Sequence, residues 1–349
     1  MTLRDELVAR IRVEGPLSLA DYMAACLMHP VHGYYTTRDP LGVAGDFTTA
    51  PEISQMFGEL LGLALAQAWM DQGQPDFTLA ELGPGRGTLM ADILRATRQV
   101  PGFVDAAAVH LVETSPVLRD AQRRAVPQAT FHDSLDTLPE APLFLVANEF
   151  FDALPIRQFQ RDGRGWRERV VGVQGDALQM GLSEAAPLQM LAHRLGDTKD
   201  GDIVEACPAL PGIVAQIDQR IATHGGAALI VDYGDWASLG DTFQAVAAHN
   251  TVDPLVDPGA ADLTAHVDFA AIAAAAPQVA CSYMVQQGVF LERLGITQRA
   301  QALARSLTGP ALDAHIAAHR RLTAPDEMGH LFKVIGLTPR NAPPLAGTT

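Results

Sequence analysis

The chain has 349 residues, of which 48% are hydrophobic and 19% are charged, and its formal net charge at pH 7 is -15. This composition is that of a globular protein and excludes a disordered chain. The negative charge also argues against a nucleic acid as the main partner, because the phosphate backbone would be repelled. The length suits one large α/β domain with additions, or two domains.

The cysteines and the N-terminal residues indicate the type of cellular compartment in which the protein is expected. Cys26, Cys207 and Cys281 are far apart and form no C-x-x-C pair, so we expect reduced, structural thiols and no metal site. Asp5 and Glu6 stand where a signal or transit peptide would be basic. No uninterrupted apolar run reaches the roughly 18 residues of a membrane-spanning helix. We therefore expect a soluble protein of a reducing compartment, without stable membrane insertion.

Residues 1–45 form a predicted N-terminal helical region. A first helix should stop at Gly15-Pro16, and Ser18 has the side chain of an N-cap for a second helix. A long apolar helix is expected from Ile53 to about Met70.

The segment before that long helix allows two interpretations. Thr49, Pro51 and Glu52 are typical of a helix start, with Thr49 as the cap and Glu52 completing a capping box. This leaves Gly45-Asp46-Phe47 unexplained. Asp46 is therefore either a carboxylate that acts on a ligand or one that stabilises the loop.

The most informative stretch runs from Glu81 to Thr88, with Gly83, Gly85 and Gly87 at alternate positions between a predicted strand at 77–80 and a helix. Glycine permits a positive φ and the close approach of a ligand, and such a turn before a helix suits a nucleotide-like ligand. The spacing is G-x-G-x-G, whereas the dinucleotide pattern is G-x-G-x-x-G. Glu81 would repel a pyrophosphate but suit the ammonium group of a methionine moiety. A plain strand-to-helix turn is the alternative.

Six further strands are predicted at 108–112, 129–131, 143–147, 227–231, 282–287 and 332–335. Polar residues follow three of them: Glu113, then Asp133 and Ser134, then Asn148. Ligands of open parallel sheets bind at the carboxyl ends of the strands, so Glu113 is placed to accept hydrogen bonds from ribose hydroxyls. Asp133 and Ser134 would lie at an adenine edge.

Two carboxylates, Glu149 and Asp152, follow the strand at 143–147. They could orient a cationic acceptor and take its proton, although Asp152 could instead cap a helix. Asp232, after the strand at 227–231, either lines the cleft or forms a turn. His266 and Asp268 could form a polar pair over the site.

The remaining segments divide the chain. The predicted core comprises residues 46–155 and 206–338, separated by a β-rich insertion at 156–205 with Asp-Gly turns. A helical insertion is expected at about 290–328. Residues 253–268 are predicted as a loop over the sheet edge, and the Pro/Ala/Gly-rich tail 339–349 should fray.

Six blocks of the sequence resemble one known family. They are residues 45–54, 58–61, 81–89, 148–155, 230–234 and 262–269. By these blocks, which span roughly residues 15 to 335, the chain is similar to the MidA-like family of S-adenosylmethionine-dependent methyltransferases. The resemblance implies an α/β fold with a seven-stranded Rossmann-like methyltransferase sheet and S-adenosyl-L-methionine as the cofactor. It places Glu81, Gly83, Gly85, Gly87, Glu113, Asp133, Ser134 and Asn148 at the cofactor.

The resemblance also implies an activity. One family member is a mitochondrial complex I assembly factor described as a protein-arginine methyltransferase. The resemblance therefore implies an arginine on a protein as the substrate, and a subunit of the respiratory NADH dehydrogenase as that protein. Glu149, Asp46 and Asp152 are the expected catalytic carboxylates. The location would be the bacterial cytoplasm, or the mitochondrial matrix for a processed eukaryotic form, and a homodimer through the helices at 290–328 is possible.

Three other functions stay open at this point. They are a cofactor-binding assembly chaperone with little catalysis, a methyltransferase acting on a small molecule, and a nicotinamide-dependent dehydrogenase. The glycine spacing and Glu81 argue against the last.

Overall fold

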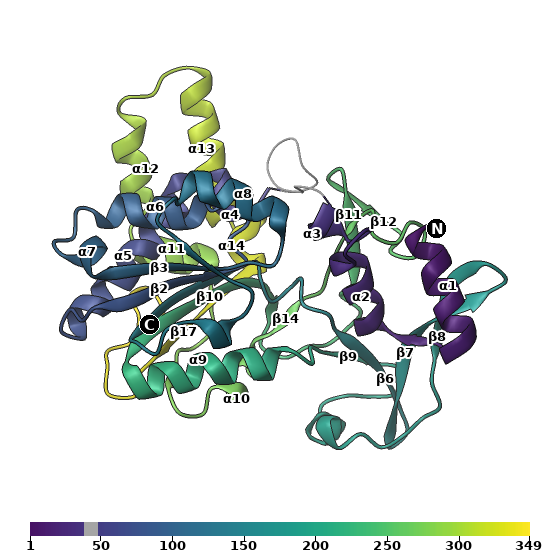
Figure 1. The fold of residues 1–349 in the computed structure, drawn as a ribbon. Helices are drawn as coiled ribbons and strands as arrows, with labels where there is room; N and C mark the ends of the chain where they lie inside the picture. The colour runs from purple at the N-terminus through teal and green to yellow at the C-terminus, as the bar shows by residue number, and fades with distance from the viewer. Residues whose placement is uncertain (38–47) are drawn as a thin grey trace.

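The computed structural model describes residues 1–37 and 48–349 (Figure 1). The predicted catalytic residue Asp46, with Gly45 and Phe47, lies outside the described residues.

A nine-stranded sheet forms the centre of the described chain, with the strand order β15-β17-β10-β5-β2-β3-β4 and with β14 and β16 attached to β10 and β17. The strands are β2 (Phe77–Leu82), β3 (Ala107–Val112), β4 (Thr130–His132), β5 (Leu143–Asn148), β10 (Gly226–Asp235), β14 (Val267–Asp268), β15 (Ala280–Cys281), β16 (Val285–Gln286) and β17 (Phe332–Thr338). Neighbours from β10 to β4 pair in parallel, and β17 is antiparallel to β10. All six residues of β2 and of β5 are buried, as expected for parallel strands covered on both faces.

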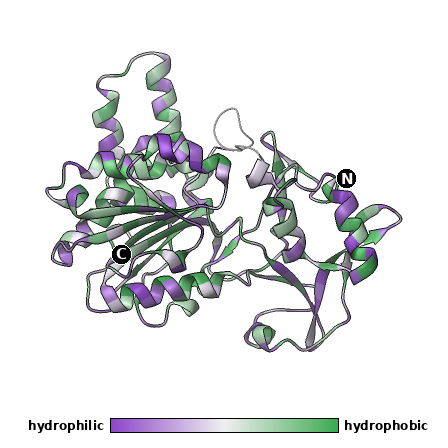
Figure 2. Cartoon of the chain, in the orientation of Figure 1, coloured by the Kyte–Doolittle hydropathy of each residue, from purple (hydrophilic) through white to green (hydrophobic). Residues whose placement is uncertain are grey.

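Helices cover both faces of this sheet (Figure 1). Residues of α4 (Ala50–Ile53), α5 (Gln55–Asp71), α6 (Thr88–Thr97), α7 (Phe103–Ala106), α11 (Gln287–Arg293), α12 (Ile296–Ala304) and α14 (Met328–Leu331) share one core with the sheet. Residues of α9 (Leu210–His224), α10 (Phe269–Ala275) and the short η1 (Leu135–Thr137) share the core on the other face. Figure 2 shows the central strands mainly in the hydrophobic colour, while the helices carry both colours.

Two further helices complete this half of the molecule. Between β3 and β4 runs α8 (Pro116–Ala125), and α13 (Pro310–Thr323) pairs with α12 in a hairpin that projects from the body (Figure 1). The predicted helical insertion is therefore confirmed.

A second lobe lies beside the sheet and has its own core (Figure 1). It contains α1 (Leu3–Glu14), β1 (Leu17–Ser18), α2 (Leu19–Met28), α3 (Tyr34–Thr37), β6 (Arg157–Asp162), β7 (Gly165–Gln174), β8 (Ala177–Leu182), η2 (Gln189–Leu195), β9 (Ile203–Ala206), β11 (Gln244–Ala247), β12 (Asn250–Val252) and β13 (Asp262–Thr264). The predicted β-rich insertion is confirmed by β6 to β9, which form one sheet with β1. Chain segments far apart in sequence thus meet in one hydrophobic cluster.

The N-terminal helix signals are confirmed. Gly15 ends α1 with φ 93°, and the Ser18 hydroxyl accepts a hydrogen bond from the Asp21 amide at the start of α2. The predicted single helix from Ile53 is wrong, because Ser54 is extended and begins a new helix by capping Met56. Thr49 makes no capping bond, and the Glu52 carboxylate instead accepts from the Thr88 hydroxyl.

Three predictions near the end of the chain are wrong. Of the predicted strand 282–287 only β16 forms, and β15 lies just before the predicted range; between the two, the Ser282 hydroxyl takes the place of a ladder acceptor for the Gly336 amide. The predicted loop 253–268 contains β13 and β14, which pair with β11 and β10. The sheet consequently has nine strands rather than the expected seven. The tail does not fray, because Leu345 and Thr348 are 2% and 1% exposed.

The docking of the tail can be tested by Leu345→Ala. Because Leu345 belongs to the main core, we expect a loss of about 2–4 kcal/mol in the free energy of unfolding, measured by chemical denaturation. Leu239→Ala is the matched control, since Leu239 is 57% exposed and should change stability by less than about 0.5 kcal/mol. Equal effects of the two changes would mean that the tail does not pack.

Candidate functional site

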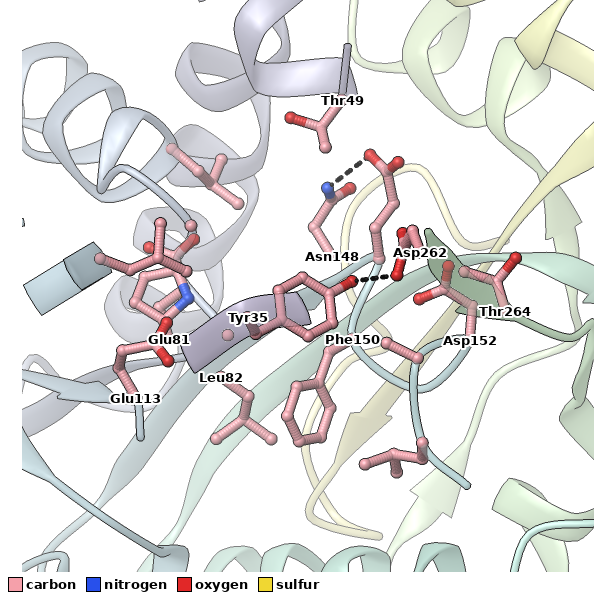
Figure 3. Close-up of a pocket in the computed structure, with 18 of the residues that line it drawn as sticks. Tyr35, Thr49, Glu81, Leu82, Glu113, Asn148, Phe150, Asp152, Asp262 and Thr264 are labelled. Atoms are coloured by element: carbon pink, nitrogen blue, oxygen red, sulfur yellow. Dashed lines mark hydrogen bonds between the residues drawn. The ribbon is translucent and has the colours of Figure 1, made fainter. Parts of the chain in front are cut away.

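A cavity of about 760 Å³ lies at the carboxyl ends of the parallel strands. Its wall on the sheet side comes from the segments that follow β2, β3, β4 and β5, and its other wall comes from the second lobe. Figure 3 shows Glu81 and Glu113 at one end, and Asn148, Asp152, Asp262 and Thr264 at the other. The cavity therefore has two ends that carry different polar groups.

The glycine loop between β2 and α6 forms part of the first end. Gly83, Gly85 and Gly87 have φ angles of 59°, 53° and 83°, a region that other residues rarely adopt. Gly83 and Gly85 line the cavity, but Gly87 does not. A Cβ atom on Gly87 would lie 3.3 Å from Ala125 Cβ of α8. Gly87 is therefore explained by close packing against α8 and by its left-handed φ at the N-cap of α6.

Glu81 lies under this loop, at the end of β2. It is 2% exposed, and burial raises the pKa of its carboxyl to about 8. Within the described residues its Oε2 has no hydrogen-bond partner. A cationic or hydrogen-bond-donating ligand group would satisfy this oxygen.

Glu113, at the end of β3, is held in place by its neighbours. Its carboxylate accepts hydrogen bonds of 2.7 Å from the Ser115 amide and 3.1 Å from Gln122 Nε2, and burial raises its pKa. Gln122 Nε2 also donates to the Gly85 carbonyl at 2.7 Å. Gln122 therefore joins the glycine loop to Glu113, a role that its helical position in the sequence did not reveal.

Asp133 and Ser134 line the cavity after β4 but are exposed. Asp133 accepts from Arg119 Nη2 at 2.6 Å, and the Ser134 hydroxyl donates to Asp136. Both lie near the rim, so a ligand there would compete with water.

Asn148 and Glu149 follow β5 at the second end of the cavity. Glu149 has a φ of 51°, and its Oε1 accepts hydrogen bonds of 3.0 Å from both the Ala50 amide and Asn148 Nδ2. Burial is the main cause that raises the pKa of Glu149 to about 7, and the nearby Asp152 raises it further. Asn148 Oδ1 is buried without a partner among the residues described.

Asp152 points its carboxylate to the same end of the cavity, and burial raises its pKa. Its Oδ1 is another buried oxygen with no partner in the described part of the chain. Asp232 does not line the cavity; its Oδ2 accepts from the amides of Phe151 and Asp152 at 3.0 and 3.2 Å. Asp232 therefore positions the loop that carries Asp152, and Asp152 caps no helix.

The second lobe supplies residues that the sequence did not single out. Tyr35, Asp262 and Thr264 line the cavity, and Arg321 reaches it from α13. No sequence pattern brings Asp262 to the same cavity as Asn148, because the two residues are 114 positions apart and the cavity joins them only through the packing of the two lobes. The predicted pairing of His266 with Asp268 is not formed: His266 packs against Tyr233, and Asp268 caps α10.

Arg86, for which the sequence allowed solvent or a ligand carboxylate, lines the cavity with its Nη1 4.0 Å from Glu52 Oε2. In the described ranges no group of three or more metal-binding side chains is found. No described helix is both long and apolar enough to span a membrane.

The comparisons with known proteins agree with this geometry. Residues 60–285 match the model of a family of S-adenosyl-L-methionine-dependent methyltransferases. The chain belongs to this family. It depends on S-adenosyl-L-methionine, and the glycine loop, the unpartnered Glu81 oxygen and the Glu113 carboxylate fit such a group.

Individual members of the family are similar over nearly the whole chain. The chain is 38% identical to the mouse protein named "Protein arginine methyltransferase NDUFAF7, mitochondrial", with 95% of this chain and 83% of the relative covered. The protein of the same name from Xenopus laevis is 36% identical, covering 99% and 88%. A crystal structure of a COG1565 superfamily member from Burkholderia thailandensis, bound to S-adenosyl-homocysteine, has a TM-score of 0.84 to this chain at 29% identity, with 99% of this chain and 94% of that chain covered.

Burial of Glu149 predicts a stability cost that depends on pH. Its pKa is raised on folding, so the cost is absent below about pH 4.5 and complete above about pH 7. Glu149→Gln keeps an acceptor for the Ala50 amide, and we expect it to be about 1–3 kcal/mol more stable than the parent at pH 8 and equally stable at pH 4. Denaturation at the two pH values measures this.

The control is Glu140→Gln, at an exposed carboxylate, which should show no such difference between the two pH values. A Glu149→Gln variant as stable as the parent at pH 8 would contradict the assignment.

Proposed function

We propose that this methyltransferase transfers methyl groups to arginine side chains of a protein substrate. The main support is the second end of the cavity, which Glu149 and Asp152 line and where buried acceptor oxygens on Asp152 and Asn148 have no hydrogen-bond partner among the described residues. A guanidinium group has five N–H donors and a permanent positive charge, so it matches several buried acceptors at once. The relatives named as protein arginine methyltransferases support the same substrate.

The residues that would hold the cofactor are those of the first end. Glu81 would receive the ammonium group, the glycine loop would admit the ligand against its backbone, and Glu113 would accept from the ribose hydroxyls. Asp133 and Ser134 would border the adenine, and Asn148 would lie between the two ends. Gly87 contributes by shaping the loop.

When bound, S-adenosyl-L-methionine supplies a methyl group on a sulfonium, and its transfer breaks the carbon–sulfur bond, leaves the electron pair on sulfur and forms a carbon–nitrogen bond on the acceptor. The acceptor nitrogen must lose one proton in the same overall step. Glu149 would take it, because its pKa of about 7 allows it to be ionised before the step and protonated after it. Asp152 would hold the remaining positive charge away from the attacking nitrogen.

The wider setting is part of the same proposal. The strand order from β15 to β4 supports a Rossmann-like methyltransferase sheet to which β14 and β16 are additions. The family resemblance supports a subunit of the respiratory NADH dehydrogenase as substrate and a role in complex I assembly. The two relatives are named mitochondrial, and this chain would act in the matrix if eukaryotic and in the cytoplasm if bacterial. The homodimer stays a prediction from the sequence.

Transfer of labelled methyl groups from S-adenosyl-L-methionine into a lysate of cells that lack this gene tests the activity. We expect one labelled protein, with the label mapped to arginine by mass spectrometry. Glu149→Gln should lower the initial rate by at least about 100-fold because it removes the proton acceptor. Label on a small molecule or on another residue type would refute the arginine assignment, and cofactor binding without any transfer would favour the chaperone.

Cofactor binding is tested by Gly85→Val, compared with Gly163→Val. Both glycines have a left-handed φ, 53° and 56°, so both changes strain the backbone, but Gly163 lies in a β-hairpin turn with open space around it. We expect Gly85→Val to weaken binding of S-adenosyl-homocysteine by at least about 100-fold in calorimetry, an estimate for a branched side chain placed in the loop. Equal binding by the two variants would mean that the glycine loop does not hold the cofactor.

A further inference from the structure

The cavity has an acidic residue on the second lobe that lies outside the predicted site. Asp262 on β13 is 4% exposed and lines the cavity. Its Oδ1 accepts a hydrogen bond of 2.7 Å from the hydroxyl of Tyr35, which also lines the cavity. Figure 3 shows this pair beside Asp152. A carboxylate of the second lobe is therefore held in a fixed orientation next to the carboxylates of the core.

Tyr35 is itself fixed to the first end of the cavity. Its backbone carbonyl accepts a hydrogen bond of 2.6 Å from the Ser115 hydroxyl. Ser115 is fully buried, caps α8, and donates its amide to Glu113 Oε1 at 2.7 Å. The position of the Tyr35 ring is thus set by the same residues that hold Glu113.

The strand that carries Asp262 is also bonded to the core. The Ala265 amide donates to the backbone carbonyl of Asp152 at 3.0 Å, and Gly234 of β10 pairs with Val267 of β14. The separation between Asp262 and Asp152 is therefore set by backbone hydrogen bonds. These bonds hold the two lobes at a more fixed distance than side-chain packing alone would.

The Tyr35 hydroxyl is a permanent donor to Asp262. Burial and the nearby carboxylates Asp262 and Asp152 raise the pKa of Tyr35 well above its ordinary value. Both carboxylates and the phenol line the same cavity.

We propose that Asp262, oriented by Tyr35, binds the cationic side chain of the acceptor together with Asp152, so that the guanidinium is held by both lobes. The inference rests on the proposed function. The Oδ1 atoms of Asp152 and Asn148, which have no hydrogen-bond partner among the described residues, supply acceptors on the core side, and Asp262 supplies a carboxylate on the other lobe. The planar guanidinium fork has donors on several edges and can reach both. Tyr35 is a positioning residue and acts through Asp262.

The test titrates N-acetyl-L-arginine amide into the full chain saturated with S-adenosyl-homocysteine, with binding followed by NMR. Asp262→Asn should weaken binding of this probe by at least about tenfold, because it removes one charged acceptor. Tyr35→Phe should weaken it by about threefold, an estimate for a neutral hydrogen bond that acts indirectly. Asp262→Glu should restore part of the affinity. The Kd of S-adenosyl-homocysteine, measured by calorimetry, should change less than about twofold in each variant, which also shows that the variants fold.

A double-mutant cycle separates positioning from a general loss of structure. If Tyr35 acts through Asp262, the variant with both changes should bind the probe no more weakly than Asp262→Asn alone. Tyr283→Phe, at a tyrosine that is 90% exposed, is the matched control and should leave both affinities unchanged.

Parental affinity for the probe in Asp262→Asn, additive losses in the cycle, or an equal loss of S-adenosyl-homocysteine binding would each overturn the inference while leaving the proposed function intact. A parent chain that binds S-adenosyl-homocysteine but neither binds the probe nor methylates arginine would overturn both.

Discussion

The desolvation of carboxylates at the carboxyl ends of the parallel strands is the constraint on which this site depends. Glu81, Glu113, Glu149 and Asp152 are carried by the ends of β2, β3 and β5 or by the loop after β5, and burial raises the pKa of each. Burying carboxylates costs free energy, and a folded chain keeps them buried only when the rest of the structure holds them in place. The sheet does so, because its buried strands leave little freedom to the segments that follow them.

The second lobe forms one wall of the cavity that these carboxylates line. It covers the strand ends, contributes Tyr35 and Asp262, and thereby turns a sheet edge into a cavity. The burial that raises the pKa of Glu149 also strengthens its attraction for a guanidinium, because electrostatic attraction is stronger where solvent is excluded. Burial is thus the cause both of the energetic cost of ionising these carboxylates and of their capacity to bind a cation. Asp232 shows how the core holds such a carboxylate in place. It is fully buried and accepts hydrogen bonds from two backbone amides of the loop that carries Asp152.

Several parts of the site were predictable because their signals are local. The glycine spacing placed the loop, and the apolar runs followed by single polar residues placed Glu113 and Asn148 at a common edge. Where the sequence had two interpretations, the deciding contact came from elsewhere in the chain. Glu52 is the N-terminal acid of a short helix, but its carboxylate bonds to Thr88 on α6. Gly87 belongs to the glycine motif, but it packs against α8 and does not line the cavity.

Short contiguous patterns in the sequence were enough to predict where the main parallel strands lie along the chain, where the glycine loop lies, which carboxylates follow the strands, and the family. Which of these carboxylates share a cavity depends instead on the tertiary structure. Asp262, Tyr35 and Glu149 are brought together by the packing of a lobe assembled from three distant segments, and hydrophobic burial, which drives that packing, has no direction along the sequence. The tail is a second example. Its Pro/Ala/Gly-rich composition predicts a frayed segment, but Leu345 packs into the main hydrophobic core.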